Sequence, residues 1–117
     1  MTEEYIIAEG ILQDKKHHRK AKIEIEFYVA VHNGGKTNRY YKLHFSGKEL
    51  ASFIRQCGIN KLFTFFTDHE DGRCYGYIIL SEKGLKIILK KLEKWFEWIE
   101  KPDIETKLFL TKLRWSG

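Results

Sequence analysis

The chain has 117 residues, of which 43% are hydrophobic and 32% charged, a balance that fits one folded domain and excludes an intrinsically disordered chain. The net charge is +5, and residues 15–48 hold nine of the 21 Lys and Arg but only two acids. Such a local excess suggests a polyanionic partner, although small lysine-rich proteins are also often basic without binding nucleic acid.

Nothing in the sequence resembles a secretion signal or a membrane span. Residues 1–10 are acidic at their charged positions, and no run approaches the about 20 apolar residues that a spanning helix needs. Cys57 and Cys74 are far apart and match no metal or redox spacing. We therefore expect a soluble intracellular protein of the cytoplasm, with reduced thiols, no bound cofactor and no membrane partner.

The first part of the chain predicts three strands. Residues 4–13 are typical of a strand, and residues 22–32 have the clearest period of two in the sequence. The NGGK tract at 33–36 is a turn signal, and residues 39–45 form the returning strand. The side chains expected to point inward are Ile23, Ile25, Phe27, Val29, Val31, Tyr41, Leu43 and Phe45.

Two further elements follow in the middle of the chain. Ser46 and Glu49 form a capping box that predicts a helix over 46–58, which Gly58 would end. Residues 61–67 and 74–80 predict a second hairpin across the loop at 68–73.

Ser81 predicts the start of a long C-terminal amphipathic helix that continues to about Lys101, where Pro102 stops it. The apolar side chains that follow helical spacing, and that we expect to be buried, are Leu85, Ile88, Leu89, Leu92, Trp95, Phe96 and Ile99. Residues 103–115 fit a strand or a helix, and the alternation of Thr106, Leu108 and Leu110 favours the strand.

The predicted order is therefore β-β-β-α-β-β-α-(β), in a single α+β domain with an antiparallel sheet of five or six strands. The same order of elements is found in the OB-fold barrel, in which the ligand lies on the second and third strands. An open sheet with both helices on one face explains the pattern equally well.

The tract KKHHRK, residues 15–20, is the strongest candidate for a phosphate-binding loop. It precedes the second strand, whose outward face with the third strand combines tyrosines and cations, the two components of a single-strand nucleic-acid platform. The predicted nucleic-acid-binding residues are Lys15, Lys16, His17, His18, Arg19, Lys20, Lys22, Tyr28, Arg39, Tyr40, Lys42 and His44. The alternative is an ordinary solvated sheet face, since Glu24 and Glu26 lie there too and would pair with lysines.

We also considered metal sites and a protein-binding surface. The DHED tract at 68–71 suggests a divalent cation and a metal-dependent nuclease, but no second carboxylate–lysine cluster supports that chemistry, and we expect no metal and no enzyme activity. On the predicted C-terminal helix, the residues that align on one flank as a protein-binding patch, or as the edge of the buried face, are Ile87, Lys91, Lys94 and Trp98.

Two functions remain. The first is a small non-enzymatic protein that binds DNA or RNA, without sequence preference, through the basic loop and the aromatic hairpin face. The alternative is a protein-binding inhibitor or adaptor, such as the compact anti-defence factors common on phages and mobile elements. The sequence indicates neither the partner nor the oligomeric state.

Overall fold

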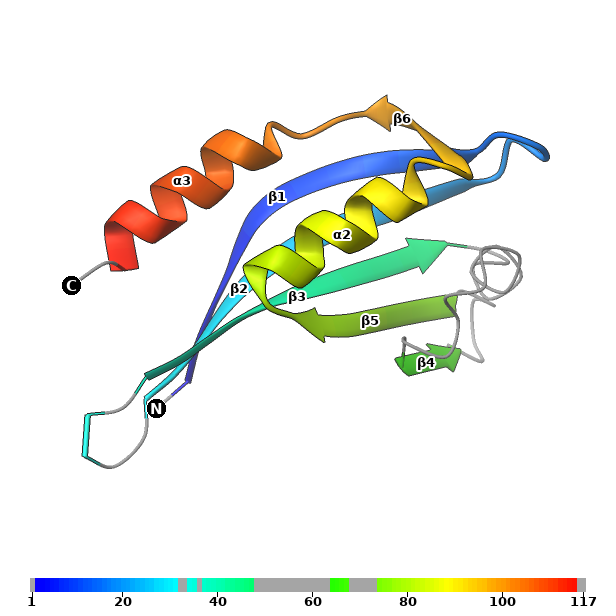
Figure 1. Ribbon diagram of the computed structural model, residues 1–117. Coiled ribbons are helices and arrows are strands. Elements are labelled where there is room, and N and C mark those ends of the chain that lie inside the picture. The colour runs from blue at the N-terminus through cyan, green and yellow to red at the C-terminus, as the bar shows by residue number, and fades with distance from the viewer. Residues whose placement is uncertain (1, 32–33, 36, 48–63, 68–73, 116–117) are drawn as a thin grey trace.

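The computed structural model describes residues 2–31, 34–35, 37–47, 64–67 and 74–115 (Figure 1). Six strands and two helices make up this described part of the chain. In chain order they are β1 (Thr2–Asp14), β2 (Lys20–Val31), β3 (Thr37–Gly47), β4 (Thr64–Thr67), β5 (Cys74–Leu80), α2 (Glu82–Leu92), β6 (Phe96–Glu100) and α3 (Ile104–Trp115). The fold is therefore α+β, as the sequence predicts. The helix expected over 46–58 does not begin at Ser46, because Ser46 and Gly47 are the last residues of β3, and residues 48–58 lie outside the described residues.

All six strands belong to one sheet in the order β4-β5-β3-β2-β1-β6, and every neighbouring pair is antiparallel. The two long hairpins β1–β2 and β2–β3 and the short hairpin β4–β5 were predicted. A barrel would require the edge strands β4 and β6 to pair, but they lie at opposite ends of the strand order. The sheet is open, and the OB-like barrel is not borne out.

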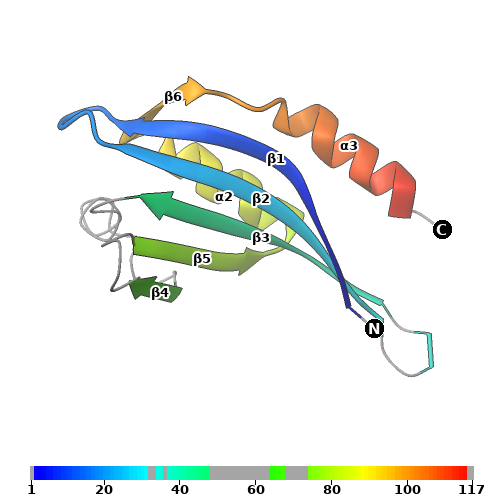
Figure 2. The same ribbon diagram turned by 180° about the vertical axis from the view of Figure 1, so that it is seen from behind.

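Both helices lie on the same side of the sheet. In Figure 1, α2 lies in front of the middle of the sheet, where it contacts β3 and β5, and α3 runs beside β1. Lys112 of α3 is paired with Glu82 of α2 at 2.8 Å, which joins the two helices. Seen from behind, α2 lies behind β2 and β3, and no helix of the described residues covers this side of β2, β3 and β5 (Figure 2).

The core forms between this helix pair and the inward side of the sheet. The alternation in β2 and β3 buries the predicted side chains, with the exception of Val31, which is exposed near the end of its strand. The helices add Leu85, Ile88, Leu89, Leu92 and Leu108 to the same cluster. Tyr5, Phe27 and Trp115 pack their rings together at 5.7–6.0 Å, which attaches α3 to β1 and β2.

The long C-terminal helix is shorter than predicted. Leu85, Ile88, Leu89, Leu92 and Phe96 are buried as expected, but Trp95 and Ile99 are 44% and 45% exposed. The chain leaves the helix at Glu93 and pairs with the second half of β1, from Ile11↔Glu100 to Asp14↔Phe96. The backbone of β1 needs hydrogen-bond partners along this edge, and the aromatic and β-branched residues of 95–99 favour a strand.

The close approach of β6 to β1 depends on a glycine. A Cβ atom at Gly10 would lie 2.7 Å from the carbonyl oxygen of Glu100 and 2.9 Å from the ring of Trp98. Any side chain at this position would push β6 away from β1.

The tail forms a helix, and the preference for a strand at 103–115 was wrong. The Asp103 carboxylate accepts a hydrogen bond from the Thr106 backbone N–H at 3.2 Å, which caps the first turn. The side chains that face the core are Ile104, Leu108, Thr111 and Trp115, and their spacing is that of one helical face. The apparent alternation at 106–110 had no structural meaning, because Leu110 is exposed.

The end of α2 gives a test of this packing. Leu92 is 1% exposed at the last turn, so Leu92→Ala should lower the free energy of unfolding by about 2–5 kcal/mol. Trp95→Ala is the matched control three residues further on, and it should cost about 1 kcal/mol or less, because the indole lies outside the core. Urea denaturation of both variants measures the difference, and equal losses would support a helix that continues past residue 92.

Candidate functional site

The side of the sheet opposite the helices is the candidate site, and we call it the open face. Strand register arranges its side chains in rows across the sheet, and three of these rows carry the tyrosines and their neighbours. The first row is Glu4, Tyr28 and Tyr40, the second is Ile6, Glu26, Lys42 and Ile79, and the third is Glu9, Glu24, His44 and Tyr77. The period of two in β2 and β3 produces this arrangement, because each strand buries one set of side chains and presents the other.

The open face carries aromatic rings beside a cation. Tyr28 and Tyr40 are opposite each other on β2 and β3, with ring centroids 6.4 Å apart. The Lys42 ammonium lies 4.7 Å from the ring centroid of Tyr77, within the range of a cation–π contact. His44 adds a fourth ring, 6.2 Å from Tyr77. Of these, Tyr28, Tyr40, Lys42 and His44 were predicted. Tyr77 was missed, although it lies two residues after Tyr75 in β5 and therefore on the same face of that strand.

A cavity of about 370 Å³ lies at one end of this face. It is lined by Glu4, Tyr28, Tyr40, Lys42 and Ile79, which come from four strands. The volume is within the range of small-molecule sites. Its lining combines two tyrosine rings, an isoleucine, an ammonium group and a carboxylate.

Glu26 lies beneath this group as a largely buried carboxyl. Its side chain is 12% exposed, its Oε2 lies 3.1 Å from Nε2 of His44, and its Oε1 is buried without a hydrogen-bond donor. Burial, followed by the neighbouring carboxylate of Glu4, raises the pKa of Glu26, and the nearby His44 only partly opposes this. Glu26 therefore holds a proton to a higher pH than an ordinary glutamate does.

The KKHHRK tract is a hairpin turn built on Asp14. The Asp14 side chain is buried and accepts hydrogen bonds from the backbone N–H groups of Lys16 at 2.7 Å and His17 at 2.9 Å. It also accepts from Nε and Nη2 of Arg19 at 3.2 and 3.1 Å. His18 has a left-handed backbone, with φ of 57°, which completes the turn.

This geometry divides the predicted basic residues of the loop into two groups. Arg19 is held by Asp14, and Lys15 donates from Nζ to the Glu93 carbonyl oxygen at 2.9 Å, so both stabilise the fold. Lys16, His17, His18 and Lys20 are exposed at the surface. Lys20 and Tyr28 are eight residues apart on one strand, or about 26 Å, so loop and cavity lie at opposite ends of the sheet.

Two of the other predicted cations lie in different surroundings. Lys22 is on the open face and forms an ion pair with Glu24 at 2.9 Å. Arg39 is opposite Val29, whose side chain faces the core, and it lines a cavity with Phe27 and Tyr41 on the helix side. Arg39 was predicted among the nucleic-acid-binding residues, and its position in the alternation of β3 puts it on the face opposite the tyrosines.

The predicted patch of Ile87, Lys91, Lys94 and Trp98 is not one helix flank. Trp98 belongs to β6, where it packs against the core and donates from Nε1 to Oε1 of Glu93 at 3.1 Å. Ile87 remains exposed on α2. The alignment failed because it assumed an unbroken helix to Lys101.

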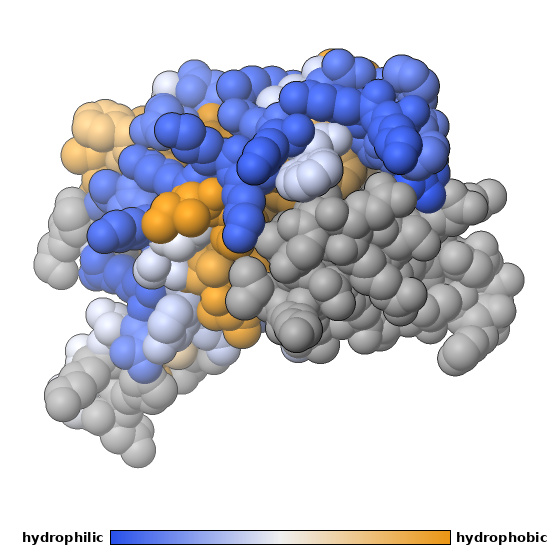
Figure 3. Space-filling model, turned by 45° about the vertical axis from the view of Figure 1, so that its right-hand side comes forward, coloured by the Kyte–Doolittle hydropathy of each residue, from blue (hydrophilic) through white to orange (hydrophobic). Residues whose placement is uncertain are grey.

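An apolar stripe on α3 was not predicted. Its members Phe109, Leu110 and Leu113 are 52–60% exposed. Figure 3, which views the molecule obliquely from the helix side, shows hydrophobic surface at the upper left and left of centre. The stripe could have been found only by assigning the tail to a helix.

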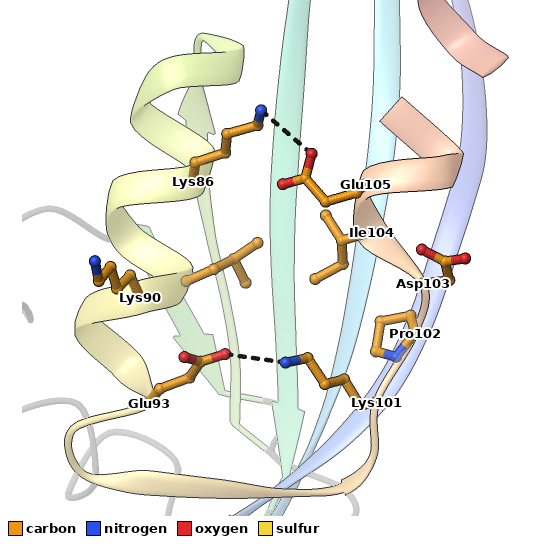
Figure 4. Close-up of a pocket in the computed structure, with 9 residues that line it drawn as sticks. Lys86, Lys90, Glu93, Lys101, Pro102, Asp103, Ile104 and Glu105 are labelled. Carbon is orange, nitrogen blue, oxygen red and sulfur yellow. Dashed lines mark ion pairs between the residues drawn. The ribbon is translucent and has the colours of Figure 1, made fainter. Parts of the chain in front are cut away.

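The groove between α2 and the segment leading into α3 encloses about 620 Å³ (Figure 4). Ion pairs cross it between Lys86 and Glu105 at 3.5 Å and between Lys101 and Glu93 at 3.6 Å. Because its charges pair across it, the groove fits a structural contact between the two segments better than a ligand site.

The described ranges contain no group of three or more His, Cys, Asp and Glu that could hold a metal ion. The DHED tract lies outside the described residues. None of the helices in the described ranges is long and apolar enough to cross a membrane.

Comparison with protein-family models, curated proteins and solved structures found no match to this chain. Its function therefore has to be inferred from its own residues.

Asp14 should make the fold sensitive to acid. Burial alone would raise its pKa, but the N–H groups of His17 and Lys16 and the Arg19 guanidinium outweigh burial and hold the pKa below its ordinary value. Its contribution to stability is therefore present above the unfolded-state value of about 3.9 and is lost as the pH falls through the folded-state value. Asp14→Asn should lower the free energy of unfolding in urea by about 1–3 kcal/mol at pH 7. It should also reduce the loss of stability that the wild type shows as the pH falls into the acidic range. If Asp14→Asn loses stability at acidic pH as steeply as the wild type does, Asp14 does not have this role.

Glu26 should affect the pH dependence of folding stability in the opposite direction. Because its pKa is raised by burial and Glu4, the folded state binds its proton more tightly, and stability is highest below about pH 4.3 and falls as the pH rises through the folded-state value. Glu26→Gln should be at least as stable as the wild type at pH 7, and the two should converge near pH 4. Urea unfolding at pH 4, 5.5 and 7 tests this, with Glu9→Gln as the exposed control on β1. A Glu26→Gln variant that is less stable at pH 7 would mean that the ionised form is favoured.

Proposed function

We propose that this protein binds single-stranded nucleic acid on the open face of its sheet. The observation that carries the proposal is the group of Tyr28, Tyr40 and Tyr77 with Lys42 on a face that no described helix covers. Aromatic rings on an exposed sheet are a common platform for unstacked bases, and each stacked base contributes about 1–3 kcal/mol.

The carboxylates of the open face do not argue strongly against this function. Glu24 is paired with Lys22 at 2.9 Å, and Glu26 lies 3.1 Å from His44 with its pKa raised by burial. Much of the acidic charge on the face is thus compensated locally. Lys42, on the middle row, remains beside the tyrosines to contact a phosphate.

The basic turn at residues 15–20 would form a second contact with the nucleic acid, separate from the contact made by the tyrosines of the open face. Lys16 and Lys20 are exposed at the far end of the same hairpin, about 26 Å from Tyr28 along the strand. A strand of several nucleotides that lies along β2 would reach both ends. Affinity should therefore rise with oligonucleotide length until both ends are occupied.

A binding assay separates the two contributions. Tyr28→Leu and Tyr40→Leu should each weaken the binding of single-stranded RNA or DNA by about 1–3 kcal/mol and leave the salt dependence nearly unchanged. The double variant Lys16→Gln/Lys20→Gln should instead reduce the slope of log K against log salt by about 0.7 for each lost phosphate contact. Fluorescence polarisation at several salt concentrations measures both effects.

The matched control is Lys90→Gln/Lys91→Gln, which removes two exposed charges from α2 on the helix side. It should lower affinity less than the loop variant, because these lysines face away from the tyrosines. If the wild type has no measurable affinity for single-stranded DNA or RNA at low ionic strength, the proposed function is wrong.

A second candidate function, protein binding, is favoured by the apolar stripe of Phe109, Leu110 and Leu113 on α3. Three large apolar side chains close together on one exposed helix surface, at positions i, i+1 and i+4, are typical of a protein interface. Leu113→Asp should change the free energy of unfolding by less than about 0.5 kcal/mol and should weaken any self-association seen by sedimentation velocity. A marked loss of stability would show that the stripe belongs to the core.

A further inference from the structure

The cavity at the first row of the open face has a lining that suits one particular kind of nucleotide. Tyr28 and Tyr40 offer ring surface, Glu4 offers a carboxylate at one side, and Lys42 offers an ammonium group at the other. Stacking surface, a hydrogen-bond acceptor and a cation correspond to the base, the base edge and the phosphate of a nucleotide.

The spacing of these groups agrees with that correspondence. Glu4 is on β1 in the first row, and Lys42 is two strands away in the second row. With strands about 4.8 Å apart and rows about 6.8 Å apart, their backbone positions are about 12 Å apart. That span matches a nucleotide lying across the sheet, with its base edge toward β1 and its phosphate toward β3.

The carboxylate of Glu4 selects among the bases. A carboxylate only accepts hydrogen bonds, and its two oxygens match two neighbouring N–H donors. The Watson–Crick edge of guanine presents such a pair, N1–H beside the 2-amino group. Adenine and cytosine place their amino group beside an acceptor nitrogen, and uracil flanks its single N–H with two carbonyl oxygens that would face the carboxylate.

Glu26 is a close neighbour of Glu4 on the open face. Its largely buried carboxyl lies 3.1 Å from His44, and the negative charge of Glu4 contributes to its raised pKa. A carboxylate has about four lone-pair sites, so Glu4 can accept two hydrogen bonds from one base edge.

We propose that the cavity bounded by Glu4, Tyr28, Tyr40 and Lys42 is a guanine nucleotide subsite. This rests on the proposed function when the guanine belongs to a nucleic-acid strand. A free guanine nucleotide has the same chemistry, and a cationic ligand such as an arginine side chain is disfavoured because Lys42 borders the site.

Short RNAs that differ at one base provide the test. We would measure the binding of seven-nucleotide oligouridylates with G, inosine, A, C or U at the centre by fluorescence polarisation. The G-containing strand should bind about 5- to 100-fold more tightly than the A-containing strand, the range that one bidentate base contact gives. Inosine should be intermediate, because it keeps N1–H and lacks the 2-amino group.

Variants assign the preference to Glu4. Glu4→Gln should reduce the ratio of G to A affinity toward one, while Glu9→Gln, the control on the same strand, should leave the ratio unchanged. Tyr40→Leu should weaken all five RNAs by a similar factor. Glu4→Gln should melt within a few degrees of the wild type, since Glu4 is exposed.

The outcomes separate this inference from the proposed function. If all five RNAs bind equally well, or if Glu4→Gln keeps the G preference, the guanine subsite is wrong and nucleic-acid binding stands. If guanosine monophosphate binds more tightly than adenosine monophosphate but no RNA or DNA strand binds, the subsite is right and the proposed function is wrong. If no oligonucleotide and no mononucleotide binds, both are wrong.

Discussion

The pairing of β2 with β1 on one side and β3 on the other is the constraint on which the rest of the structure depends. β2 alternates buried Ile23, Ile25, Phe27 and Val29 with the outward Glu24, Glu26 and Tyr28. A shift of one residue would exchange these two sets, so burial of the apolar set fixes the register. The turn around Asp14 holds one end of the β1–β2 hairpin in that register.

The same register creates the open face. Because Tyr28 is opposite Tyr40 and Glu26 is opposite Lys42, rings and charges alternate along the strands and meet across them. Most of these contacts would suit a solvated sheet, but the buried Glu26 beside Glu4 would not, since a carboxyl held away from water and near another carboxyl costs stability. Groups that a fold retains at such a cost often serve binding or catalysis, which is why the functional proposals centre on this end of the face.

The basic tract illustrates how a charge count differs from a charged surface. Six consecutive basic or histidine residues suggest one phosphate-binding arm, yet Arg19 neutralises the buried Asp14 and Lys15 holds the end of α2. These two side chains stabilise the junction of β1, β2 and α2. The remaining positive charge is smaller and lies far from the tyrosines, so any ligand that uses both must extend along the hairpin.

By itself, the sequence determined the features that depend on neighbouring residues: the three long strands, their inward and outward sets, the start of α2 at Ser81, and the outward Tyr28, Tyr40, Lys42 and His44. It did not determine the fate of residues 93–115. The apolar residues of this region fit helical spacing and strand alternation alike, and the choice was made by the unpaired edge of β1, which takes residues 96–100 as a strand and leaves 104–115 to cover the core as a helix. Likewise, the cavity and the Glu26–His44 pair join residues from strands far apart in the sequence. Only the tertiary structure brings such residues together, because their contacts depend on strand order and register rather than on local pattern.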